Sequence, residues 1–227
     1  RGVDIAFISA STQLSGELAP IAVAAGALVI DDSSYFRMQP QVPLVVPEVN
    51  GQDVEWHQGI IAIPNCSTTP MVMALYPLHR VNPIKRIVVD TYQSVSGTGR
   101  AAVEELREQS EKLLQELPIS RKVYPHQVAF NAIPHVEIFQ DNGYTREEMK
   151  MENEGRKIMH HPRFCASTTC VRVPVYRAHS IAVNAEFTKV VTVAAARRIL
   201  KKAPGLDLVD NVSRNLYPLP LDVAGKD

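Results

Sequence analysis

The sequence predicts an α/β fold: a partial Rossmann-type doubly wound parallel sheet, followed by an α+β domain. Uniformly apolar runs occur early in the chain, as in strands buried on both faces of a parallel sheet. Segments with helical periodicity separate these runs, which gives the β-α-β order of a doubly wound sheet. Longer alternating strands replace that order in the second part. We therefore place the two domains at residues 1–65 and 66–227.

The first domain is expected to contain three short strands and two helices. The strands are expected at residues 3–9, 27–32 and 60–63, and the helices at 15–25 and 67–79. Gly26 follows the first helix and ends it. Residues 39–50 are expected to be an extended stretch, but their three prolines prevent it from being a central strand throughout. Hydroxyls at residues 67–69 are available to cap the second helix, and Pro70 suits its first turn.

The second domain is expected to begin with a long strand rich in β-branched residues. We expect strand 84–95, helices 100–117, 145–159 and 193–202, and one or two antiparallel strands within 167–187. The antiparallel assignment rests on alternation of apolar and polar residues, which is typical of a sheet with one solvated face.

Composition excludes several classes of protein. The 24 basic and 24 acidic residues give a formal net charge of zero, whereas binding through nucleic-acid phosphates usually needs a basic excess. The longest apolar stretch, residues 19–30, contains Pro20 and Gly26 and is too short to cross a bilayer. The three cysteines show neither metal-site nor disulfide-framework spacing. We expect a cytoplasmic enzyme with no nucleic-acid or membrane partner and no bound metal.

The candidate nucleophile is Cys66, in the motif IPNCSTTP between a strand end and a helix start. Unpaired N–H groups and the positive end of the helix dipole stabilise an anion there. Such a thiol is expected to be nucleophilic at neutral pH, and Asn65 can add a donor beside it. The alternative is a small buried apolar residue, the common fate of a lone cysteine.

Three further residues are candidates for proton transfer and anion binding. His179 can exchange a proton with the thiol, although histidines on strands are more often structural. Arg172 lies seven residues earlier, so a bend at Pro174 is needed for both side chains to face one site. Arg37, in a proline-bounded loop, suits a carboxylate or a phosphate; a surface salt bridge is its alternative.

Four motifs together closely resemble the bacterial type of the aspartate-β-semialdehyde dehydrogenase family: PNCSTTPMVMAL, TYQSVSGTG, AFNAIPHVEIFQDNGYTREEMKM and TTCVRVPVYRAHS. That family makes L-aspartate 4-semialdehyde from L-4-aspartyl phosphate and NADPH, with release of phosphate. The resemblance therefore implies an NADP-dependent reductive dephosphorylation through a cysteine thioester, on the route to lysine, methionine and threonine. It also implies a homodimer or a homotetramer.

The resemblance implies catalytic roles for three residues. Cys66 is similar to the nucleophile, His179 to the general acid/base, and Gln93 to the residue that orients the intermediate.

The resemblance also implies how the substrate is held. Arg172 is similar to the arginine that pairs with the α-carboxylate, and Glu147 to the acid that meets the α-amino group. Arg37 and Lys150, with Asn65 beside them, are similar to the residues that hold the phosphate. A zwitterion that carries a phosphate needs this combination of one acid and several cations.

The cofactor site is the least complete part of the resemblance. The family's Gly-rich turn for the cofactor phosphates is not found in this sequence. We therefore expect an interior fragment that lacks this turn and the C-terminal segment. The remaining expected cofactor neighbours are Ser9, Ala10, Ser33, Ser34 and Gly97.

Two alternatives to this function stay open. One is an enzyme like N-acetyl-glutamyl-phosphate reductase, whose substrate has no free amino group for Glu147 to meet. The other is a non-catalytic paralogue that serves as a dimerisation module. Such a protein can lose its nucleophile or base, but Cys66 and His179 are both present here.

Overall fold

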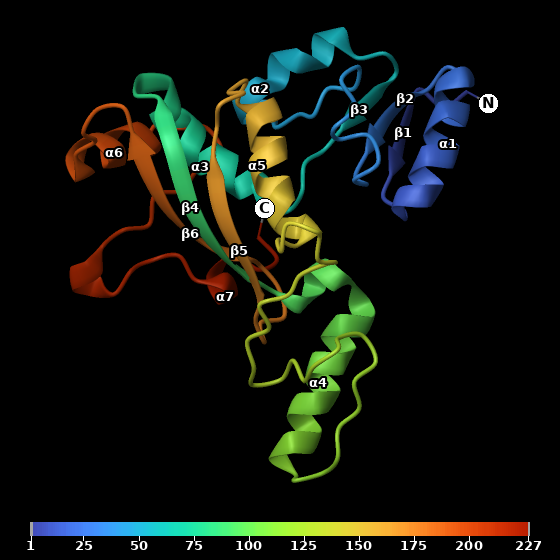
Figure 1. Cartoon of the computed structure of the whole chain (residues 1–227), viewed down its shortest axis with the longest axis vertical. Helices are drawn as coiled ribbons and strands as arrows, with labels where there is room; N and C mark the ends of the chain where they lie inside the picture. The colour runs from blue at the N-terminus through green and yellow to red at the C-terminus, as the bar shows by residue number, and fades with distance from the viewer. Residues whose placement is uncertain (1, 227) are drawn as a thin grey trace. The chain divides into compact units, whose positions relative to one another are not determined.

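The computed structural model describes residues 2–226 and divides into two compact units (Figure 1). Unit 1 combines Arg1–Arg86, Lys150–Cys165 and Ala185–Asp207, and unit 2 combines Ile87–Met149, Ala166–Asn184 and Leu208–Asp227. The boundary expected after residue 65 falls inside unit 1, and the division into two domains at that point stays a prediction.

Unit 1 contains a parallel sheet in the order β1-β2-β3, formed by Ile5–Ile8, Leu28–Asp31 and Ile60–Ala62. Helix α1 (Thr12–Ala24) connects β1 to β2 and packs on both strands. Leu44 adds a parallel bridge to Ala62, which extends the sheet beyond β3. The expected doubly wound parallel arrangement of this region is confirmed.

Two expectations in unit 1 are corrected. Strand β1 is not buried on both faces, since Ile5 is 49% and Phe7 76% exposed. In the described residues β1 pairs only with β2, so it forms an edge of the sheet. The proline-rich stretch is not extended throughout, because it includes helix α2 (Pro47–Asn50), followed by the 3₁₀-helix η1 (Gly51–Trp56). Pro47 occupies the first turn of α2, where its missing N–H costs little.

Three further helices belong wholly or largely to unit 1: α3 (Thr68–Val81), α5 (Arg146–Ile158) and α6 (Val193–Leu200). Helices α3 and α6 pack against each other. Gly155 allows α5 to pack closely, because a Cβ atom there would lie 3.0 Å from the Phe164 ring and 3.4 Å from the Met71 side chain. This packing fixes α5 beside the start of α3, where Cys66 lies.

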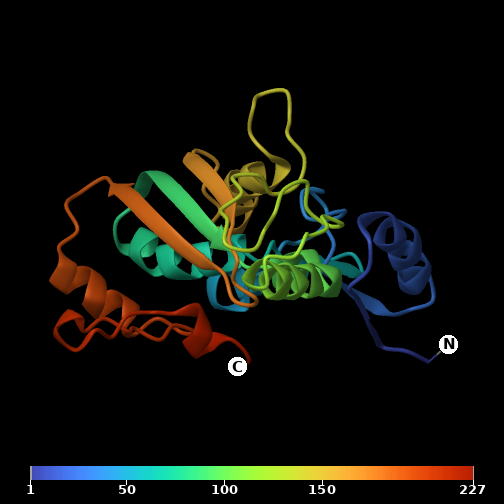
Figure 2. The same cartoon turned by 90° about the horizontal axis from the view of Figure 1, so that it is seen from below.

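The second sheet has the order β5-β4-β6, formed by Ala166–Arg172, Ile84–Gln93 and Ser180–Phe187 (Figure 2). Strand β5 runs parallel to β4, in a register that pairs Ile87 with Ala166 and Gln93 with Arg172. The antiparallel orientation expected for this strand is therefore wrong. The chain between β4 and β5 contains two helices, which is the crossover that parallel strands need. Alternation of apolar and polar residues indicates that one face of a strand is solvated, but it does not indicate whether the strand runs parallel or antiparallel to its neighbour.

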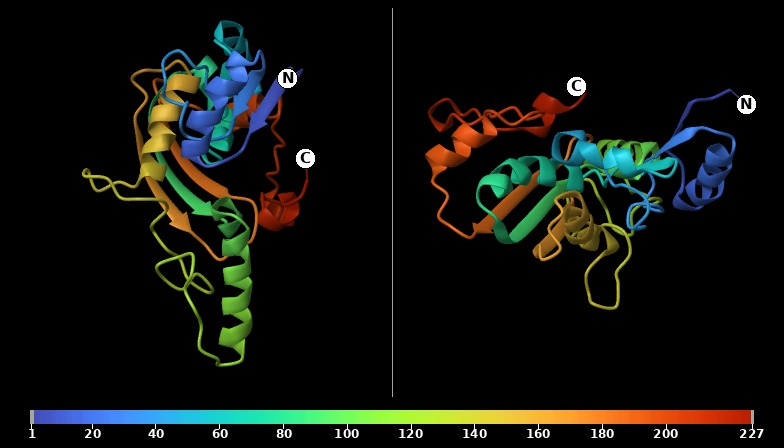
Figure 3. Two further views of the ribbon diagram at one scale, coloured as in Figure 1. Left: turned by 90° about the vertical axis from the view of Figure 1, so that its right-hand side faces the viewer. Right: turned by 90° about the horizontal axis from the view of Figure 1, so that it is seen from above.

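In unit 2, helix α4 (Arg100–Leu114) follows the 3₁₀-helix η2 (Val95–Thr98), and the next segment runs back along α4 (Figure 3). Two buried polar side chains of α4 hold that segment. The Glu105 carboxylate accepts hydrogen bonds from the backbone of residues 122–124, and Gln109 Oε1 accepts from Val128 and Ala129. The chain ends with η3 (Val212–Arg214) and α7 (Pro220–Val223).

Among the helices of residues 2–226, none combines the length and apolarity that crossing a membrane requires.

Candidate active site

Cys66 is exposed and lies immediately before Ser67, the N-cap of α3. Asn65 forms the turn around it: Asn65 Oδ1 accepts from the Ser67 N–H at 2.9 Å, and Asn65 O accepts from the Thr69 N–H at 3.1 Å. The alternative that Cys66 is a buried apolar residue is wrong. Cys170 is the buried cysteine, and burial raises its pKa to about 12, as expected for an inert structural thiol.

The hydroxyl capping expected at the start of α3 is corrected. Ser67 has helical dihedral angles, and its buried Oγ has no hydrogen-bond partner within residues 2–226. Thr68 Oγ1 instead lies 3.8 Å from Met151 Sδ, and Thr69 Oγ1 donates to Asn65 O at 3.2 Å. The backbone N–H groups that we assigned to the hydroxyls are instead bonded by Asn65, whose side chain accepts from Ser67 and whose carbonyl oxygen accepts from Thr69.

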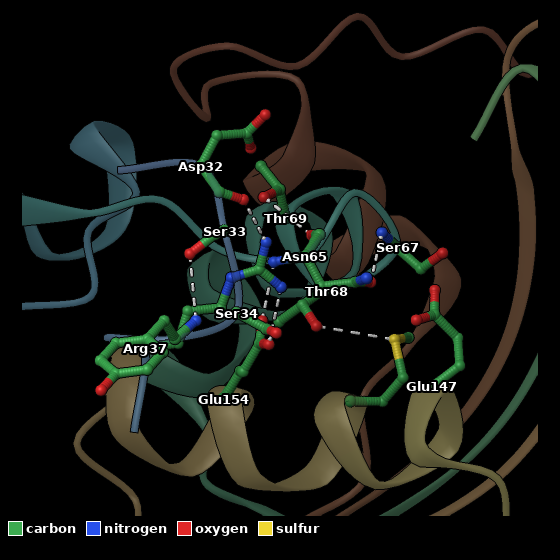
Figure 4. Close-up of polar contacts among 12 residues, drawn as sticks. Asp32, Ser33, Ser34, Arg37, Asn65, Ser67, Thr68, Thr69, Glu147 and Glu154 are labelled. Carbon is green, nitrogen blue, oxygen red and sulfur yellow. Dashed lines mark hydrogen bonds and ion pairs between the residues drawn. The ribbon is translucent and has the colours of Figure 1, made fainter. Parts of the chain in front are cut away.

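Arg37 is 6% exposed and forms a buried ion pair, not the surface salt bridge that we considered (Figure 4). Its Nη1 lies 3.1 Å from Glu154 Oε1, and its Nη2 donates to Asp32 O at 2.8 Å. Glu154 Oε2 accepts from the backbone N–H of Asn65 at 2.8 Å. Burial raises the pKa of Glu154, and the positive charges of Arg37 and Lys150 oppose that rise. The predicted residues Arg37, Asn65 and Lys150 are thus brought around one carboxylate.

A second group of predicted residues lies in unit 2, at the ends of β4 and β5. Gln93 Nε2 donates to Glu147 Oε1 at 2.9 Å, while Thr91 Oγ1 donates to Gln93 Oε1 at 3.2 Å. Both Gln93 and Glu147 are buried. This chain of hydrogen bonds fixes the Gln93 amide against the Glu147 carboxylate, whose oxygens act only as acceptors when ionised.

Arg172 is buried beside this pair, with Nη1 donating to Ser94 O at 2.5 Å. Its guanidinium carbon also lies 5.9 Å from the centre of the Tyr124 ring. The buried Nε of Arg172 has no hydrogen-bond partner in the part of the chain that the structure describes. An unpaired guanidinium N–H in a buried place is costly, and a bound carboxylate would satisfy it.

His179 also belongs to this group. Strand β5 ends at Arg172 and β6 begins at Ser180, so the expected bend at Pro174 is confirmed. A Cβ atom at Gly97 would lie 3.3 Å from the His179 ring and 3.6 Å from Arg172 Nη1. Both side chains therefore lie beside Gly97, where a Cβ atom would press closely on the His179 ring.

The orientation of the His179 ring is set by Ser94, whose backbone N–H and Oγ both lie 3.0 Å from Nδ1. A backbone N–H can only donate, so Nδ1 is the acceptor and the neutral ring carries its proton on Nε2. Taking up a proton at Nε2 requires the other tautomer, in which Nδ1–H would donate to Ser94 Oγ. This arrangement favours His179 as a donor at Nε2.

The pKa of His179 is lowered from 6.5, first by burial and then by the charge of Arg172, while Glu147 opposes the shift. An NMR titration of the imidazole should therefore give a midpoint below 6.5. Between that midpoint and 6.5 the unfolded chain binds more protons, so this residue's contribution to stability decreases as the pH falls. Arg172→Gln should raise the midpoint and Glu147→Gln should lower it. A midpoint at or above 6.5 in the unchanged protein would contradict this assignment.

The expected cofactor neighbours divide between the two units. Ser9 follows β1 and donates to Asp32 Oδ2 at 2.9 Å, and Ser34 Oγ lies 3.2 Å from Thr12 Oγ1 in the first turn of α1. Ala10, with Ser9, lies at the carboxyl end of β1, the edge at which doubly wound sheets bind dinucleotides. Hydroxyls, a carboxylate and a helix start fit the sugar and phosphate groups of such a ligand.

Two other expected neighbours are used differently. Ser33 is buried, donates to Asp31 Oδ2 at 2.8 Å and accepts from the Tyr35 N–H, so its hydroxyl stabilises the turn. Gly97 belongs to unit 2 and makes the close approach to His179 described above.

The histidine pair near the end of α5 has separate partners. His160 Nε2 lies 3.0 Å from Asp53 Oδ2, and His161 Nε2 lies 2.9 Å from Ile84 O. Within residues 2–226, no group of three or more His, Cys, Asp or Glu side chains is arranged to hold a metal ion.

Sequence reasoning missed Glu154 and Ser94, which hold several predicted residues in place. Glu154 follows Lys150 by four residues on α5, so helical spacing places the two on one face and was the available signal. Ser94 acts largely through its backbone N–H and C=O groups. The residue type does not indicate such contacts, so the sequence offered no signal for them.

Two family models match the chain: "Semialdehyde dehydrogenase, NAD binding domain" over residues 1–57, and "Semialdehyde dehydrogenase, dimerisation domain" over residues 75–227. The aspartate-semialdehyde dehydrogenases of Aquifex aeolicus and Bacillus subtilis are each 48% identical, over 100% of this chain and 68% of their own length. The crystal structure of aspartate semialdehyde dehydrogenase II complexed with ASA from Vibrio cholerae is 43% identical. It superposes with a TM-score of 0.96 and covers 99% of this chain and 67% of that one. The chain thus spans about two thirds of these relatives, and it belongs to the aspartate-semialdehyde dehydrogenase family.

Proposed function

We propose that this chain catalyses the NADP-dependent reductive dephosphorylation of L-4-aspartyl phosphate to L-aspartate 4-semialdehyde. The observation that carries the proposal is the exposed Cys66 at the start of α3, in a chain that is 48% identical to two aspartate-semialdehyde dehydrogenases. The reaction belongs to the biosynthesis of lysine, methionine and threonine.

Acylation of Cys66 is the first step. The Cys66 thiolate attacks the acyl carbon, a carbon–sulfur bond forms, and the carbon–oxygen bond to phosphate breaks. The positive end of the α3 dipole and the N–H groups at the start of that helix favour both the thiolate and the negative charge that develops on the acyl oxygen. Arg37 and Lys150, with Asn65, are the proposed phosphate-binding residues, and phosphate leaves with the bonding electron pair.

Arg172 and Glu147 are proposed to bind the two charged groups of the amino acid. The unpaired buried Nε of Arg172 supports its role toward the α-carboxylate, because a planar fork can donate two parallel hydrogen bonds. The buried Glu147 carboxylate supports a role toward the α-amino group. Gln93, hydrogen-bonded to Glu147, is proposed to orient the intermediate.

The second half of the reaction converts the thioester to the aldehyde. NADPH, when bound, supplies the hydride for this reduction. His179 is proposed to donate from Nε2 to the acyl oxygen while the tetrahedral centre persists, and Cys66 then leaves as the thiolate. A neutral imidazole suits this role, and its lowered pKa keeps it neutral near pH 7. Ser9, Ala10, Ser33 and Ser34 remain the proposed cofactor neighbours in unit 1, and Gly97 remains the proposed neighbour in unit 2.

The match of residues 75–227 to a dimerisation domain supports a dimer. A homotetramer and a cytoplasmic location are further proposals. Light scattering coupled to size-exclusion chromatography distinguishes a dimer from a tetramer, and cell fractionation checks the location.

The test of the proposed function is turnover by the full-length enzyme with L-aspartate 4-semialdehyde, inorganic phosphate and NADP⁺. NADPH should form only when all three are present. Turnover with the N-acetylglutamate semialdehyde instead would indicate the related reductase. Dimerisation without turnover on either aldehyde would indicate a non-catalytic module.

Arg172→Lys is expected to lower kcat/KM for the semialdehyde by about 10- to 100-fold, since hydrogen bonds to charged groups contribute about 1.5–3 kcal/mol. Lysine keeps the positive charge but loses the planar fork. A carboxylate held less firmly also moves the reacting carbon off line, so kcat should fall together with a rise in KM. Steady-state kinetics check this, and wild-type values would place the carboxylate elsewhere.

A further inference from the structure

We propose that Glu154 is a positioning residue, whose carboxylate joins the Arg37 side chain to the backbone immediately before Cys66. The inference rests on the proposed function, in which Cys66 is the nucleophile and Arg37 holds the phosphate. Glu154 Oε1 accepts from Arg37 Nη1 at 3.1 Å, and Glu154 Oε2 accepts from the Asn65 N–H at 2.8 Å (Figure 4). One carboxylate thus contacts both the proposed phosphate-binding residue and the neighbour of the nucleophile.

The two contacts require a carboxylate and not only a side chain of that size. Glu154 is 2% exposed, and a buried carboxylate is tolerated only when it is paired and hydrogen-bonded. A glutamine of the same shape has one acceptor oxygen, and its NH₂ group would face either the Arg37 guanidinium or the Asn65 N–H. Two donors would then oppose each other, and one of the two contacts would be lost.

Asn65 transmits this constraint to Cys66. Glu154 holds the Asn65 N–H, while Asn65 Oδ1 accepts from the N–H of Ser67. Cys66 lies between these two residues, so the hydrogen bonds restrain the backbone on both sides of it. Reaction at a thiolate depends on alignment, and an error of about 1 Å can cost about 100-fold in rate.

Helix α5 also holds Arg37 at a second point. Lys157, three residues after Glu154, donates from Nζ to the carbonyl oxygens of Arg37, Gln39 and Val42 at 2.7, 2.8 and 2.7 Å. All three ammonium protons therefore bind the loop that carries Arg37. The same helix fixes both the backbone and the side chain of Arg37, which indicates a rigid support.

The test compares Glu154→Gln with Glu152→Gln in the full-length enzyme. Glu152 lies on the same helix and pairs with Arg156 at 2.8 Å, so it controls for loss of a glutamate charge on α5. With semialdehyde, inorganic phosphate and NADP⁺, Glu154→Gln should lower kcat at least tenfold and raise KM for phosphate. It should also change the rate constant for alkylation of Cys66 by iodoacetamide. In Glu152→Gln, kcat, the KM for phosphate and the alkylation rate constant should each stay within twofold of the wild-type value.

A double-mutant cycle with Arg37→Gln separates positioning from a merely structural role. If the two residues act as a unit, the double variant should lose no more activity than the worse single variant. Independent, multiplying losses would overturn the proposal. A lower melting temperature with wild-type kinetics for the folded Glu154→Gln enzyme would also overturn it.

A second variant covers the case in which Glu154→Gln does not fold. Glu154→Asp keeps the charge but is one methylene shorter, so it cannot reach both donors, and kcat should fall severalfold. Wild-type kinetics in that variant would overturn the positioning role. If Cys66→Ala also retained activity, the proposed function itself would fail. If Cys66→Ala inactivates the enzyme but Glu154→Asp leaves its kinetics unchanged, the positioning role of Glu154 is wrong and the proposed function stands.

Discussion

Replacing Cys66 with alanine in the full-length enzyme is expected to reduce kcat by about 10⁴-fold or more, as for other enzymes that lose a covalent nucleophile. Alanine has no thiol to add to the aldehyde carbonyl, so in the assayed direction no covalent adduct forms that can give up a hydride to NADP⁺, and no thioester follows. The fold should remain, because the exposed Cys66 side chain contributes little burial. Kinetics with semialdehyde, phosphate and NADP⁺, together with circular dichroism, check both parts.

The matched control is Cys165→Ala, which removes the other exposed thiol. It should leave kcat unchanged, whereas Cys170→Ala should lower stability because that side chain is buried. Iodoacetamide should label Cys66 in the unchanged enzyme, and the labelled enzyme should have no turnover. Residual activity of a few per cent in Cys66→Ala, or loss of activity in a Cys165→Ala or Cys170→Ala enzyme that circular dichroism shows to be folded, would show that another cysteine is the nucleophile.

Most of the elements around the site could be predicted from local patterns. The apolar runs and the helical periodicity place β2, β3 and α3 within two residues of their observed bounds, and with them the position of Cys66 before a helix. These features depend on neighbours in sequence. The direction of β5 depends instead on which strand it pairs with, and alternation does not encode that.

The contacts within the site were predictable only in part. Side-chain chemistry singled out Arg37, Gln93 and Arg172, but not that Arg37 would be buried against Glu154. A surface loop arginine and a buried one look the same in sequence, because burial depends on residues more than a hundred positions away. The Ser94 contacts to His179 come from backbone atoms, which every residue possesses.

His179→Ala in the full-length enzyme is expected to lower kcat by about 10²- to 10⁴-fold, the usual contribution of a positioned proton-transfer group. Alanine removes the Nε2 donor that would stabilise negative charge on the acyl oxygen. His179→Gln keeps an amide donor of similar reach, so it should recover part of the loss. Kinetics of the two variants, with circular dichroism to show that each is folded, check the donor role.

The same variants separate the donor role from activation of the thiol. The Ser94 N–H donates to Nδ1 at 3.0 Å, so the neutral ring carries its proton on Nε2 and has no lone pair there to take a proton from Cys66. The pH profile for alkylation of Cys66 by iodoacetamide should therefore change little in His179→Ala, although kcat falls. If the profile moves to higher pH by a unit or more, His179 assists deprotonation of the thiol. That result would require the ring to adopt the tautomer in which Nδ1–H donates to Ser94 Oγ, against the N–H that now faces it.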